Sequence, residues 1–154
     1  MITSSSRRGF TLLIAVILST VVLTVGLSLL DVAYKQVILS STAKQSQAAF
    51  YNADSALECA LFYDQKSDAF DFTAPAGAGT ISCNNLPVTN FVNTDKDALR
   101  RITVFTVPCT ASGISATTTV YKYANGHTSL YASGFNTCNS NDPRRVERGL
   151  KATY

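Results

Sequence analysis

Four cysteines are the residues of this chain best suited to covalent chemistry. In an oxidising compartment, an even number of cysteines typically forms disulfides. Three connectivities can form from Cys59, Cys83, Cys109 and Cys138. We favour Cys59 with Cys83, which ties the end of a helix to the segment after it, and Cys109 with Cys138, which closes a sheet. No two cysteines have the C-x-x-C spacing of a zinc knuckle, and we expect neither a metal nor a cofactor.

The other chemically active residue types give weaker patterns. The single histidine, His127, follows Asn125-Gly126, where we expect solvent and strand rather than a Ser-His-Asp or Cys-His site. The spacing Asn93-x-Asp95-x-Asp97 resembles the start of a calcium loop but lacks the later Gly and Glu, which favours a solvated turn. No phosphate-binding loop or H-E-x-x-H motif occurs. We therefore expect no enzymatic activity.

An uncharged apolar run dominates the first part of the chain, from Phe10 to Leu30. A helix of this length is about 31 Å long, which matches the hydrocarbon core of a bilayer. Arg7 and Arg8 precede the run, so the positive-inside rule keeps that end in the cytoplasm and exports the remainder. The run is longer than the core of a secretory signal and no A-x-A pattern follows it, so we expect a persistent single-pass span.

A second helical pattern continues from the apolar run without interruption. The chain contains neither Gly nor Pro from Asp31 to Lys66, and Asp31 with Lys35 can form an i,i+4 ion pair. An apolar face with spacings of three and four residues is predicted to pack against the rest of the chain. The residues of this face are Phe50, Ala53, Leu57, Ala60 and Leu61.

From Ser67 onward the composition changes to that of strands and loops. We predict a short strand near 80–83 and longer strands at 101–107, 117–124 and 127–133, with a type I′ turn at Asn125-Gly126. A terminal strand buries Val146, Leu150, Ala152 and Tyr154 on one face, although Arg148 interrupts that face. The predicted fold class is α+β, with one long helix packed on three or four antiparallel strands.

The junction between the basic leader and the apolar run reads Arg7-Arg8-Gly9-Phe10-Thr11-Leu12-Leu13. This motif resembles the prepilin processing motif of type IV pilins and pseudopilins. The stretch from Gln47 to Glu58 also resembles the helix of minor pilins of the PilX kind. The resemblance implies a leader at 1–9, a transmembrane and assembly helix at 10–30, an amphipathic helix at 31–66 and a disulfide-bonded head at 67–154.

The same resemblance implies how the chain is processed and which partners it contacts. A prepilin peptidase would cleave after Gly9 and methylate Phe10, and the helix would leave membrane lipid to pack with other pilin subunits on an inner-membrane assembly platform. The head would then lie on a cell-surface filament. Most pilins carry Glu at the fifth mature position, where this chain has Ile14. Because that carboxylate is thought to pair with a neighbour's amino terminus, we expect a minor subunit, near the filament tip.

Two alternatives stay open. A head that binds DNA or a surface would use basic residues together with tyrosines, although edge protection of strands is the favoured interpretation of this set. The set comprises Arg100, Arg101, Arg144, Arg145, Arg148, Lys151, Tyr121, Tyr123 and Tyr131. The second alternative is a plain single-pass membrane-anchored protein that keeps its leader.

Overall fold

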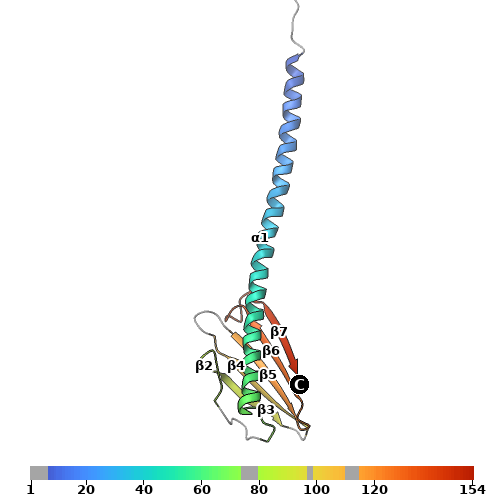
Figure 1. Cartoon of the computed structure of the whole chain (residues 1–154). Coiled ribbons are helices and arrows are strands. Elements are labelled where there is room, and N and C mark those ends of the chain that lie inside the picture. Colours follow the sequence, from blue (N-terminus) through green and yellow to red (C-terminus); the bar gives the residue numbers. More distant parts are fainter. Residues whose placement is uncertain (1–6, 74–79, 97–98, 110–114) are drawn as a thin grey trace, which may run out of the picture. The chain divides into compact units, whose positions relative to one another are not determined.

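The computed structural model of the chain describes residues 7–73, 80–96, 99–109 and 115–154. One helix, α1 (Arg7–Ser67), includes both the apolar run and the Gly- and Pro-free segment, which confirms the predicted long helix (Figure 1). It ends where Asp68 adopts a φ of 45° and the Ala69 amide donates to the Tyr63 carbonyl. The chain forms two compact units, residues 1–42 and 43–154, and α1 contributes to both.

In the described part of the chain, seven strands follow α1 and form two antiparallel sheets. The larger sheet lies alongside the lower part of α1 (Figure 1). The larger sheet has its five strands in chain order, so each strand pairs with the next one along the chain. These strands are β3 (Thr89–Lys96), β4 (Arg100–Val107), β5 (Ser115–Tyr123), β6 (Thr128–Phe135) and β7 (Glu147–Thr153). The smaller sheet is a hairpin of β1 (Ser82–Cys83) and β2 (Leu86–Pro87). The predicted α+β class is confirmed.

The strand β3 was not predicted, so the expected three or four strands fall short of the observed sheets. Its sequence, TNFVNTDK, contains two Asn and one Asp, which are depleted in strands and favour turns. Pairing with β4 holds it extended at the edge of the sheet, with two register shifts. Asn93 and Asp95 therefore lie in a strand rather than in the predicted solvated turn, and Asp97 lies outside the described residues.

The hairpin between β5 and β6 is where the sequence places it, but its turn is of another type. Gly126 has a φ of 88°, whereas Asn125 is not among the described residues with positive φ, so a type I′ turn is wrong. The Gly126 amide donates to the Tyr123 carbonyl and the Tyr123 amide to the His127 carbonyl. This is a type I turn followed by a left-handed glycine, the common three-residue hairpin loop.

A type I′ turn occurs in the other hairpin, between β1 and β2. Asn84 and Asn85 form this turn, and both have a positive φ.

The core lies between α1 and one face of the larger sheet. Alanines on α1 give a close contact with β6, and a Cβ added at Gly134 would lie 2.2 Å from the Ala53 nitrogen. Phe50, predicted to be in this face, is 44% exposed, because Ala49 occupies the position against the sheet and the spacing leaves no room for a ring. Larger side chains fill the core further along, where Phe70 stacks on Phe105. Among the described residues, the buried apolar ones are Ala49, Ala53, Ala56, Leu57, Ala60, Phe70, Ile81, Cys83, Phe105, Val107, Ala116, Val120, Leu130 and Ala132.

Candidate assembly segment

The predicted processing pair, Gly9 and Phe10, lies in the first turns of α1, where the Phe10 side chain is 67% exposed. Large apolar side chains from Phe10 to Leu30 are exposed on every side of the helix, from 41% at Ile14 to 70% at Val22. By length and composition this helix is able to cross a membrane. An apolar surface of this extent in water would be unfavourable, so it requires lipid or protein around it.

Four hydroxyl groups within the apolar run are hydrogen-bonded to the helix itself. The Ser19, Thr20 and Thr24 side chains donate to carbonyls three residues earlier, and Ser28 donates to the Thr24 carbonyl, at 2.8–2.9 Å. These donors therefore need no water, which suits a helix in a hydrocarbon environment or among other helices.

Apolar exposure continues beyond the predicted end of the run at Leu30. Val32, Val37 and Leu39 are 51–68% exposed on the following turns of α1. The predicted ion pair is present among them, with the Lys35 ammonium 2.8 Å from an Asp31 carboxylate oxygen. We call residues 10–39 the apolar segment, since only this exposed ion pair places side-chain charge within it.

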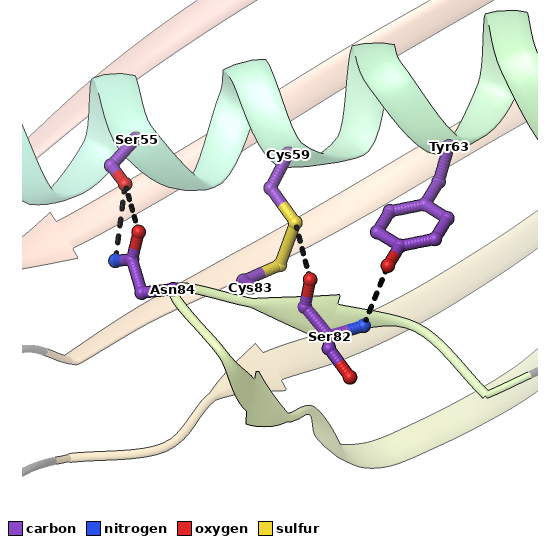
Figure 2. The surroundings of a disulfide bond; sticks show 6 residues. All are labelled: Ser55, Cys59, Tyr63, Ser82, Cys83 and Asn84. Carbon is purple, nitrogen blue, oxygen red and sulfur yellow. Dashed lines mark hydrogen bonds between the residues drawn. A yellow bond between two sulfur atoms is a disulfide. The ribbon is translucent and has the colours of Figure 1, made fainter.

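Both disulfides are present with the pairing favoured from the sequence. Cys59–Cys83 joins α1 to the β1–β2 hairpin, and Figure 2 shows two polar contacts beside it. The Tyr63 hydroxyl accepts a hydrogen bond from the Ser82 amide, and Ser55 contacts the Asn84 side chain. The hairpin is thus attached to three successive turns of α1 through side chains rather than through sheet pairing.

A polar cluster lies under the sheet near the end of α1. Asp64 is 2% exposed, Lys122 donates to both of its carboxylate oxygens at 2.8 Å, and the Tyr154 hydroxyl donates to one of them. Burial, followed by the hydrogen bond to Asp64, raises the pKa of Tyr154 well above its ordinary value. The cluster connects α1, β5 and the residue after β7, so we interpret it as structural.

The basic and aromatic residues considered for DNA binding are distributed over several parts of the head. Arg101 is 4% exposed and donates to the Asp71 carbonyl. The Arg145 guanidinium lies over the Phe135 ring and the Lys151 ammonium over the Tyr131 ring. Arg148 instead contacts α1 through Ser46, so the set does not form one basic face. DNA binding stays an alternative, and edge protection of the strands stays the favoured interpretation.

His127 lies exposed beside the hairpin turn, with its ring centroid 5.6 Å from that of Tyr123. Within the described ranges, no three His, Cys, Asp or Glu side chains are grouped closely enough to share a metal ion. No protein-family model, curated protein or solved structure matches this chain.

Proposed function

We propose that this chain is a structural subunit, a minor pilin or pseudopilin, of a type IV pilus or related filament. Prepilin peptidase removes residues 1–9 by cleavage after Gly9 and methylates the new amino group of Phe10. One observation carries the proposal: an all-round exposed apolar segment begins directly after the basic leader and continues into a helix packed on a folded head.

The apolar segment supports this proposal through its environment. From Phe10 to Leu30 the segment is apolar on every side, so lipid tails and other apolar helices solvate it equally well. It can therefore move between them at modest cost. Before assembly the subunit spans the inner membrane once, with the head on the side opposite the cytoplasm. The two disulfides suit that side, where oxidation is permitted. In the filament its partners are the helices of other pilin subunits.

Mass spectrometry of the amino terminus tests the proposal. The mature chain is expected to begin with N-methylated Phe10 when it is isolated from filaments of a cell with an active prepilin peptidase. Replacing Gly9 by Val is expected to block cleavage, because a branched side chain crowds the scissile peptide. Gly26→Ala is the matched control, since a Cβ at Gly26 meets no atom within 4 Å.

The same measurement distinguishes the proposed pilin from a plain membrane-anchored protein. Such a protein would keep Met1 to Gly9, lack methylation and be absent from purified filaments. Recovery of the unprocessed chain in its working location would contradict the proposal.

A further inference from the structure

Two residues that break the predicted burial patterns lie at the same place in the head. Phe50 was expected in the buried face of the helix, and Arg148 interrupts the apolar face of the last strand. In the structure both line one open pocket of about 530 Å³, which is formed by Ala43, Ser46, Gln47, Phe50, Tyr51 and Arg148. Positions where a sequence pattern fails are often functional sites.

Arg148 is held in an orientation suited to binding a second group. Its Nε donates to the Ser46 hydroxyl at 2.7 Å, which holds the guanidinium against α1. In the part of the chain that the structure describes, no carboxylate forms an ion pair with Arg148, whereas Arg144 lies 3.9 Å from Asp142. The terminal amino groups of a guanidinium fit the two oxygens of a carboxylate.

The walls of the pocket have the composition of a protein interface. Phe50 and Tyr51 are 44% and 59% exposed, and their rings meet edge to face with centroids 6.1 Å apart. Tyr and Arg are enriched among interface residues that dominate binding, and aromatic surroundings strengthen an ion pair by excluding water. A simple ion would gain nothing from the two exposed rings.

We infer that this pocket receives an Asp or Glu side chain of a neighbouring filament subunit, which pairs with Arg148 while the adjoining chain packs on Phe50 and Tyr51. The inference rests on the proposed filament function and adds to it a specific contact in the head. Charge complementarity supports the choice of partner, since the pocket presents a cation that the described residues leave without an acid.

The test uses the full chain in assembled filaments, with a photo-crosslinking p-benzoylphenylalanine in place of Gln47. We expect a crosslink to another filament subunit, and we expect Arg148→Ala to lower its yield about tenfold. Arg144→Ala is the matched control, because it removes the same charge from a side chain that is 79% exposed. A crosslinker at Glu58, exposed on the same helix, reports whether Arg148→Ala disturbs the filament in general.

The outcomes divide as follows. A Gln47 crosslink that depends on Arg148 but not on Arg144, with Glu58 crosslinks unchanged, supports the inference. A processed chain in filaments whose Gln47 crosslink is absent, joins lipid, or responds equally to both arginine variants overturns the inference alone. An unprocessed chain that is absent from filaments overturns the proposed function, and the inference with it.

Discussion

The Lys122 ammonium on β5 lies 2.8 Å from each carboxylate oxygen of Asp64 on α1, and this pair connects helix and sheet beneath the core. The Asp64 side chain is 1% exposed and that of Lys122 is 18% exposed, so water screens the pair only in part. Tyr154 donates to the same carboxylate and thereby attaches the residue after β7 to α1. Three elements therefore depend on one buried charge.

Removing that charge is expected to destabilise the head strongly. Asp64→Ala leaves Lys122 and the Tyr154 hydroxyl without their acceptor, at a cost of about 3 kcal/mol in the free energy of unfolding. This loss is measured by guanidinium denaturation of the full chain in detergent, with near-ultraviolet circular dichroism as the signal. Asp31→Ala is the control, because its pair with Lys35 is exposed and contributes about 0.3–0.5 kcal/mol. Equal effects of the two variants would refute the interpretation.

The close contact between α1 and β6 predicts a large effect of a single methyl group. In Gly134→Ala the new Cβ would lie 2.2–2.3 Å from backbone atoms of Ala53 and Ala49, which cannot move aside as a side chain could. We expect a loss of about 3 kcal/mol in the free energy of unfolding. Gly149→Ala in β7 should be nearly neutral, since its Cβ meets nothing closer than 3.9 Å. Thermal unfolding of both variants measures the difference in their stability. A Gly134→Ala variant as stable as the parent chain would contradict the observed packing.

Loss of the Cys59–Cys83 disulfide should release the β1–β2 hairpin from α1. A loop closed across 24 residues stabilises by about 3 kcal/mol in the chain-entropy model, and the remaining links are a few hydrogen bonds. In the Cys59→Ala, Cys83→Ala double variant, limited proteolysis is expected to cut first between 68 and 88 while the five-stranded sheet stays resistant. Cleavage that begins within β5 or β6 would show that the disulfide stabilises the larger sheet instead.

Alkaline pH should weaken the attachment of Tyr154. Because its pKa is raised in the folded chain, the unfolded chain releases this proton first, near the ordinary value of 10.0. The stabilisation is fully present below about pH 10 and declines as the pH rises through the higher folded pKa. Tyr154→Phe should therefore lose less stability than the parent chain between neutral pH and pH values above 10. Parallel losses in both chains would exclude this tyrosine as the source.

The residue at position 14 predicts where the subunit enters a filament. Ile14 is 41% exposed within the apolar segment and offers no carboxylate to a neighbouring amino terminus. Ile14→Glu is expected to enhance incorporation strongly along the whole fibre, as seen by immunogold labelling. Ile14→Leu keeps the segment apolar and serves as the control. An unchanged position of the Glu variant would count against the idea that this missing carboxylate restricts the subunit.

Local sequence signals predicted the elements of this chain well wherever the signal was strong. The absence of Gly and Pro from Asp31 to Lys66 predicted the long helix, and the apolar run predicted a segment able to span a membrane. Asn125-Gly126 marked the β5–β6 hairpin correctly. These features follow from backbone sterics and solvation, which depend on a few neighbouring residues.

Only the tertiary structure decided which residues meet. The type I′ turn formed at Asn84-Asn85 rather than at Asn125-Gly126, because strand pairing selects the turn. Polar β3 became a strand because β4 offers it backbone partners. Phe50 lies outside the core because Gly134 lets β6 pack directly on the α1 backbone, which leaves no space for a ring. Asp64, Lys122 and Tyr154 are far apart in sequence, so no local pattern could predict their cluster, and the same holds for the pocket at Arg148.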